Sequence, residues 1–92
     1  LRWSGRLNEL RRENADLHRR FSQLTPRERQ VLDFVVAGTL NKVIADRLGA
    51  AETTVKIHRG RVMEKMGAAS VPDLVRMTAR LGVLLPALAE AA

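Results

Sequence analysis

The chain contains no cysteine, which excludes a disulfide framework and a thiolate metal site. Its two histidines, His18 and His58, stand far apart in the sequence and form no zinc cluster. Aromatic residues make up 3% of the chain and runs of β-branched residues are few, which argues against a β-sheet. We therefore expect an all-α protein without a metal, a cofactor or a catalytic site.

Long apolar runs are also absent. No segment approaches the roughly 20 residues that a helix needs to cross a bilayer, and no signal sequence is visible. We therefore expect a cytoplasmic location and no membrane partner. Because the chain begins at Leu1 rather than at methionine, we also expect a fragment of a longer protein whose input domain is missing.

Positive charge is in excess. Lys and Arg number 16 against 10 Asp and Glu, which gives a net charge of +6 and a sequence pI near 11.3. A basic balance of this kind is expected of a chain that meets polyanions, and double-stranded DNA is the natural candidate. The 92 residues make one small domain, and their 46% hydrophobic content suffices for a compact core of helices.

The Arg-rich segment over residues 1–24 carries a heptad pattern. Spacings of four and three residues alternate along Trp3, Leu7, Leu10, Asn14, Leu17, Phe21 and Leu24. This pattern predicts a linker helix that forms a weak parallel coiled coil, in which Asn14 faces its counterpart and sets the register. We assign dimerisation to Leu7, Leu10, Asn14, Leu17 and Phe21. The alternative is a single solvated helix that connects two domains.

A capping box opens the second part of the chain, which we place at residues 25–83. In Thr25-Pro26-Arg27-Glu28 the threonine and the glutamate can exchange hydrogen bonds with each other's backbone, and proline suits the first helical position. The sequence predicts a helix from there to about Ala37. Glu28 thus has a structural role, with Arg47 or Arg59 as a candidate salt-bridge partner.

Three further helices are predicted from their start and stop signals. Asn41 caps a short helix that Gly49 ends, a longer helix covers residues 52–66, and Ser70 with Asp73 opens a last helix that reaches about residue 81. We expect the tail, residues 84–92, to fray or to pack weakly. On the last helix, Met77 is left as a candidate for the dimer surface because the residues expected to face inward are Val71, Leu74, Val75 and Thr78.

The helix over residues 52–66 is the candidate for a DNA-reading helix. Only a few residues around Gly49 join it to the preceding short helix, as in a helix-turn-helix. At about 100° per residue, its inward face carries Val55, Val62 and Met66, with His58 and Arg59 at the edges. Its opposite face consists of Thr53, Lys56, Ile57, Gly60, Arg61 and Glu64.

That opposite face makes poor sense as ordinary solvated surface. An exposed isoleucine beside cations suits a major groove, where Ile57 can touch a thymine methyl while Lys56 reaches guanine acceptors. Gly60 costs about 1 kcal/mol of helix propensity relative to alanine and allows the backbone close to DNA. We assign base reading to Lys56 and Ile57 and a packing role to His58 and Val62. We assign contact with phosphates, or close approach to the DNA, to Lys42, Arg47, Thr53, Thr54, Gly60, Arg61 and Lys65.

Four segments resemble the LuxR-type helix-turn-helix family, in particular its FixJ-like response-regulator branch. The similarity covers about residues 24–83, and its motifs are Leu24-Thr-Pro-Arg-Glu-Arg-Gln-Val-Leu, Asn41-Lys-Val-Ile-Ala, Thr54-Val-Lys-Ile-His-Arg-Gly-Arg-Val-Met-Glu-Lys-Met-Gly and Ser70-Val-Pro-Asp-Leu-Val-Arg-Met. The resemblance implies a four-helix output domain whose third helix reads DNA and whose fourth helix dimerises on the operator. It further implies control by an N-terminal receiver domain that a sensor kinase phosphorylates, and RNA polymerase is a further candidate partner.

Two residues depart from the family pattern. Ala51 stands where the family usually has a Ser or Thr that caps the reading helix, and loss of that cap costs about 1 kcal/mol. Gly60 stands where some relatives carry a basic, base-reading residue. Base reading is therefore expected to depend on Lys56 and Ile57.

The leading interpretation is the DNA-binding output domain of a two-component transcription regulator, which binds a two-fold site as a dimer. One alternative is a promoter-reading domain of a sigma factor, which shares the Thr-Pro-Arg-Glu-Arg opening and the Thr-Val-Lys element. Another is a coiled-coil protein-interaction module, in which the basic helix is only solvated surface.

Overall fold

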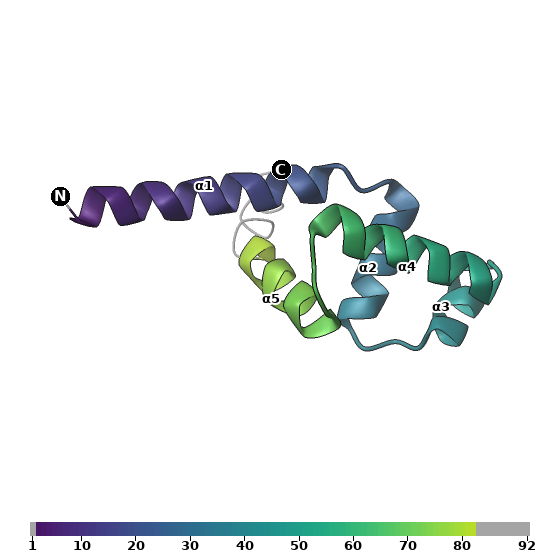
Figure 1. The fold of residues 1–92 in the computed structure, drawn as a ribbon. Coiled ribbons are helices and arrows are strands. Elements are labelled where there is room, and N and C mark those ends of the chain that lie inside the picture. The colour runs from purple at the N-terminus through teal and green to yellow at the C-terminus, as the bar shows by residue number, and fades with distance from the viewer. Residues whose placement is uncertain (1, 83–92) are drawn as a thin grey trace, which may run out of the picture.

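The computed structural model describes residues 2–82, which fold into α-helices joined by short connections and contain no strand (Figure 1). The helices are α1 (Arg2–Ser22), α2 (Pro26–Val36), α3 (Asn41–Leu48), α4 (Glu52–Met66) and α5 (Val71–Gly82). This confirms the all-α class and a four-helix domain preceded by a long helix. The tail over residues 84–92, expected to fray, lies outside the described residues. Among the described helices, none combines the length and the apolar content that crossing a bilayer requires.

The start of α2 is the capping box that the sequence predicts. The Thr25 hydroxyl accepts a hydrogen bond from the backbone N–H of Glu28 at 3.1 Å, and the Glu28 carboxylate accepts one from the backbone N–H of Thr25 at 2.9 Å. At the start of α5, Ser70 likewise accepts from the backbone N–H of Asp73 at 3.2 Å. The Asp73 carboxylate accepts from Ala69 at 2.9 Å, and this bond is the largest cause of the lowered pKa of Asp73.

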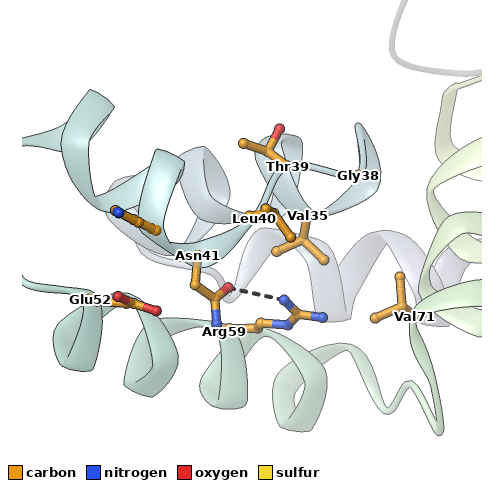
Figure 2. A pocket seen from close by; sticks show the side chains of 9 residues that line it. Val35, Gly38, Thr39, Leu40, Asn41, Glu52, Arg59 and Val71 are labelled. Carbon is orange, nitrogen blue, oxygen red and sulfur yellow. Dashed lines mark hydrogen bonds between the residues drawn. The ribbon is translucent and has the colours of Figure 1, made fainter.

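Asn41 does not cap α3, so that prediction was wrong. The N-cap residue is Leu40, which makes no side-chain hydrogen bond to the helix. The Asn41 side chain instead accepts a hydrogen bond from the Arg59 guanidinium at 3.0 Å, across the contact between α3 and α4 (Figure 2). Gly49 then ends α3 with a left-handed backbone, φ 64°, which turns the chain sharply into α4.

One core joins the described helices. Its members are apolar side chains that the packing removes almost completely from solvent: Leu17, Phe21, Val31, Leu32, Val35, Ile44, Ala45, Val55, Val62, Met66, Leu74 and Leu81. The C-terminal half of α1 lies on this core, whereas its N-terminal half projects beyond the other helices (Figure 1).

The placement of α1 corrects the assignment of Leu17 and Phe21 to dimerisation. These side chains are 7% and 8% exposed because α4 and α5 of the same chain cover them. Formation of a dimer costs translational and rotational freedom, whereas packing within one chain does not. Leu17 and Phe21 therefore pack on the domain of their own chain and not on a second copy. Packing therefore continues across the boundary placed at residue 24.

Further along α1, Asn14 is also engaged within the chain. Arg80 of α5 donates hydrogen bonds to the Asn14 amide oxygen at 3.3 Å and to the Glu13 carboxylate at 3.1 Å. This differs from the expected pairing of Asn14 with its counterpart in a second copy. Leu10 remains 45% exposed, and the side chain of Leu7 lies outside the described part of the structure.

The inward face of α5 is rotated from the one expected. Leu74 and Leu81 are buried and Met77 packs partly against the core, whereas Val75 is 38% exposed. Residues separated by three and four positions share a helix face, and the contacts of α5 with α1 and α2 select the stripe through Leu74, Met77 and Leu81. The placement of Val75 inside was therefore wrong. Met77, Val71 and Thr78 are half-buried, and a dimer contact of Met77 stays a prediction.

Candidate nucleic-acid interface

The two faces of α4 differ as the sequence predicts. Val55, Val62 and Met66 are fully buried against the core, and His58 and Arg59 are half-buried at the edges. The outer face is exposed along its length and carries Thr53, Lys56, Ile57, Gly60, Arg61 and Glu64. Because α4 lies at the surface of the bundle, this face is free to meet a large partner (Figure 1).

Ile57 is the unusual residue on the outer face of α4. Its side chain is 52% exposed although nearby positions of the same helix reach the core. Lys56 and Arg61, its neighbours on this face, are exposed and form no ion pair with an acidic residue of the described range. The arrangement therefore combines an uncovered apolar side chain with two cations.

Gly60 lies on the same outer face of α4 and leaves the backbone there uncovered by a side chain. A Cβ placed on Gly60 would have no heavy atom within 4 Å, beyond its immediate helical neighbours. Its backbone is helical, so alanine would fit there without strain. The described residues therefore give no packing reason for glycine at this position, and a partner that approaches the backbone closely would be one.

The N-termini of α3 and α4 differ from those of α2 and α5. The N-cap residues of α3 and α4, Leu40 and Ala51, make no side-chain hydrogen bond, whereas Thr25 and Ser70 cap the other two helices. The first backbone N–H groups of an uncapped helix lack partners within the helix and carry the positive end of its dipole. Thus, within residues 2–82, the two helices on either side of the tight turn have no side-chain cap at their starts.

A hollow of about 430 Å³ lies beside the start of α3. Its lining includes Val35 of α2, Asn41 of α3, Arg59 of α4 and Val71 of α5 (Figure 2). The Arg59–Asn41 hydrogen bond spans part of this lining and fixes α3 against α4. Sequence reasoning missed this bond, although Arg59 at the edge of a buried stripe needs a polar acceptor nearby.

Lys65 pairs with Glu28, which corrects two predictions. Its ammonium lies 2.6 Å from the Glu28 carboxylate, so Glu28 binds Lys65 and not Arg47 or Arg59. Lys65 also donates to the backbone carbonyl of Gln23 at 3.3 Å. These bonds fasten the last turn of α4 to the start of α2, and they argue against the phosphate contact predicted for Lys65.

Glu28 is 1% exposed and depends on this pairing for its charge. The hydrogen bond from Lys65 is the largest cause that holds the pKa of Glu28 below its ordinary value, followed by the bond from the Thr25 backbone, while burial acts in the opposite direction. Glu28 therefore remains ionised inside the protein and has the structural role expected of it.

The other residues expected at phosphates lie at the surface around α3 and α4. Lys42 stands in the first turn of α3 and Arg47 in its last, while Thr53 and Thr54 stand in the first turn of α4, and all four are exposed. His58 is half-buried, as a packing residue would be, and its Nδ1 has no hydrogen-bond partner among residues 2–82.

Two helices joined by a tight turn, the second with an exposed basic face, define a helix-turn-helix DNA-binding domain. The model of the luxR family of bacterial regulatory proteins matches residues 22–78, and the chain belongs to this family. It is thus a LuxR-type DNA-binding domain of a transcription regulator. This membership favours the regulator over the sigma-factor alternative.

Individual relatives agree with this membership. The chain is 49% identical over 75 residues to nodulation protein W of Bradyrhizobium diazoefficiens, which covers 82% of the chain and 33% of that protein. It is 48% identical to the transcriptional regulatory protein FixJ of Azorhizobium caulinodans, over 79% of the chain and 36% of that protein. The chain spans about a third of the length of these curated relatives.

A solved structure shares the fold closely. The response regulator StyR superposes with a TM-score of 0.84 at 39% identity, over 87% of the chain and 40% of that protein. Full-length FixJ from B. japonicum gives a TM-score of 0.69 at 40% identity, over 76% of the chain and 34% of that protein. In both, the chain corresponds to one part of a longer molecule.

Proposed function

We propose that this chain is the output domain of a two-component response regulator in the cytoplasm, and that it reads DNA through Lys56 and Ile57. The observation that carries the proposal is Ile57, which stands half-exposed beside cations on a helix whose other face is buried. Exposure of this apolar side chain to water is unfavourable, whereas contact with a thymine methyl group in the major groove would cover it.

Lys56 and Ile57 have complementary tasks in this proposal. The Lys56 ammonium donates to the O6 and N7 acceptors of guanine, and Ile57 makes the apolar contact with thymine. Gly60 allows the α4 backbone to approach the edge of the groove. Together these residues read a short sequence in each half-site.

Phosphate contacts would hold α4 in the groove. Lys42, Arg47 and Arg61 supply cations around it, and Thr53 and Thr54 supply hydroxyl groups. The uncapped starts of α3 and α4 add free backbone N–H groups, which suit phosphate oxygens. The domain can thus bind the DNA backbone with groups that the fold leaves unused.

Dimer formation on a two-fold site belongs to the same proposal, with half-sites separated by about one helical turn, roughly 34–36 Å. The exposed apolar residues Leu10 of α1 and Val75 of α5 are available for contact between two copies. The names of the relatives, which include response regulators, support a receiver domain as part of the whole protein. A sensor kinase that phosphorylates this receiver and RNA polymerase belong to the proposal as further partners.

Lys56→Ala is expected to weaken binding to the preferred DNA sequence by about 1 to 3 kcal/mol, because one base-reading side chain is lost. The probe is a duplex that the wild-type 92-residue chain selects from a random pool, compared with a scrambled duplex of the same composition. Fluorescence anisotropy over a series of salt concentrations gives both dissociation constants.

Arg61→Ala is the matched control, since Arg61 is an exposed cation of the same helix. This substitution is expected to weaken both duplexes alike and to reduce the salt slope by about 1. If Lys56→Ala leaves the affinity for the selected duplex untouched, the assignment of the reading face is wrong.

Gly60→Ala is expected to change folding and DNA binding in opposite directions. Alanine is the better helix former, so the free energy of unfolding rises by about 0.5 to 1 kcal/mol, provided that the new methyl group remains in open space. The same methyl group would separate the α4 backbone from DNA and raise the dissociation constant for the selected duplex. Denaturant unfolding and anisotropy measure the two effects, and unchanged DNA affinity would contradict close approach.

A further inference from the structure

The C-terminal end of α4 is bound by a side chain of α1. Arg20 donates a hydrogen bond from Nη1 to the carbonyl of Met66 at 3.1 Å, and its Nε lies 3.0 Å from the Asp16 carboxylate. Met66 is the last residue of α4, where carbonyl groups lack partners within the helix and the dipole favours a cation. Asp16 orients the guanidinium, and Arg20 closes the end of the helix.

Gly67 leaves room for this contact. It follows Met66 in the left-handed conformation, φ 68°, and a Cβ added there would collide with Nη1 of Arg20 and lie 3.3 Å from its Cζ. Gly49, which ends α3 at φ 64°, provides a comparison, because a Cβ added there would meet nothing within 4 Å. The space beside Gly67 is therefore occupied by the Arg20 guanidinium.

A second bond joins the same parts of the chain. Lys65, in the last turn of α4, donates to the carbonyl of Gln23, which follows α1. Phe21, the residue after Arg20, is anchored in the core. The last turns of α1 and α4 are thus fixed to each other by a charged hydrogen bond, a backbone contact and apolar packing.

We propose that Arg20 is a positioning residue for DNA reading: it holds the end of α4 on α1 and thereby sets the angle at which Lys56 and Ile57 enter the groove. The proposal rests on the function proposed above for α4. Base contacts require a fixed orientation, whereas phosphate contacts by flexible cations tolerate a change of angle. Loss of the Arg20 contact therefore reduces discrimination between sequences more than general affinity.

Gly67→Ala tests this without changing the charge of the chain. The dissociation constant for the duplex selected by the wild-type chain is expected to rise about tenfold, and that for the scrambled duplex by less than about twofold. Arg20→Lys also keeps the charge, but one ammonium cannot reproduce the two-sided contact of the guanidinium with Asp16 and Met66. For Arg20→Lys, the dissociation constant for the selected duplex is expected to rise by less than in Gly67→Ala, about threefold.

The effect of the collision can be separated from that of backbone strain. Gly49→Ala has the same kind of strain but displaces no side-chain contact, so its denaturation midpoint is expected to fall less than that of Gly67→Ala, which displaces the Arg20 guanidinium. In an Arg20→Ala background only backbone strain remains, so Gly67→Ala is expected to lower the midpoint by no more than Gly49→Ala does. If Gly67→Ala lowers the midpoint by the same amount with and without Arg20, then Arg20 does not occupy the space beside Gly67.

One result would overturn the positioning role: an unchanged ratio between the affinities for selected and scrambled duplexes in both Gly67→Ala and Arg20→Lys. The ratio is unchanged when neither duplex loses affinity and also when both lose it equally, and an equal loss marks a purely structural contact. If Gly67→Ala does not fold, Arg20→Lys decides the matter by the same ratio. A wild-type chain that selects no preferred sequence would refute base reading itself, and the positioning role with it.

Discussion

Phe21→Ala is expected to lower the free energy of unfolding by about 3 to 4 kcal/mol, because a large buried aromatic side chain is removed. Phe21 is packed where α1 meets the core, and the Arg29 guanidinium lies over its ring at 4.6 Å from the centroid. Both the apolar burial and this cation–π contact are lost in the variant. Urea denaturation followed by circular dichroism measures the change.

Leu10→Ala is the control for this prediction. Leu10 is an apolar residue of the same helix, but its side chain is 45% exposed, so the expected loss is at most about 0.5 kcal/mol. If Phe21→Ala costs as little as Leu10→Ala, α1 does not pack on the domain as described. The pair of variants therefore decides whether the second half of α1 is part of the domain or only a linker.

A docked α1 changes what the heptad pattern means. Positions that recur every three and four residues form a stripe on one side of a helix, and the stripe is equally suited to a second copy and to the helix's own domain. The sequence contains the stripe but not its partner. Here α4 and α5 supply the partner for Leu17 and Phe21, and Leu10 remains as an exposed apolar side chain of the seam for contact with a second copy.

The bounds and the two faces of α4 could be predicted because several local signals agree on them. Gly49 ends the preceding helix, Gly67 ends α4 itself, and Val55, Val62 and Met66 recur at helical spacing. Each signal acts within a few residues, so tertiary packing had little to add. The same holds for the capping box of α2.

The incorrect predictions concern side chains whose partners are distant in the sequence. Asn41 is a good capping residue, but in the folded protein its amide oxygen accepts a hydrogen bond from Arg59. From the sequence alone Lys65 has the character of a surface cation, whereas in the fold it pairs with the buried Glu28 carboxylate of α2. Because these contacts depend on how the helices pack, neither local spacing nor residue type could reveal them.

The contact between Lys65 and Glu28 leads to the second large effect. Lys65→Ala removes the cation from a carboxylate that is 1% exposed, and an uncompensated buried charge is strongly destabilising. Since the Lys65 side chain is 33% exposed, part of the pair is screened by solvent, and the expected loss is about 2 kcal/mol at neutral pH. Adding Glu28→Gln to this variant is expected to recover part of the loss, because the charge is then gone.

The pH dependence of unfolding separates this ion pair from simple packing. The folded protein lowers the pKa of Glu28, so its contribution to stability is complete above the ordinary value of 4.5 and is lost as the pH falls through the lowered pKa. Without Lys65, the largest cause of the lowered pKa of Glu28 is gone while burial still acts to raise that pKa, so the acid-dependent loss of stability becomes smaller. Urea titrations of both chains between pH 7 and acid measure the difference. An equally steep acid loss in Lys65→Ala would mean that Lys65 does not hold the Glu28 charge.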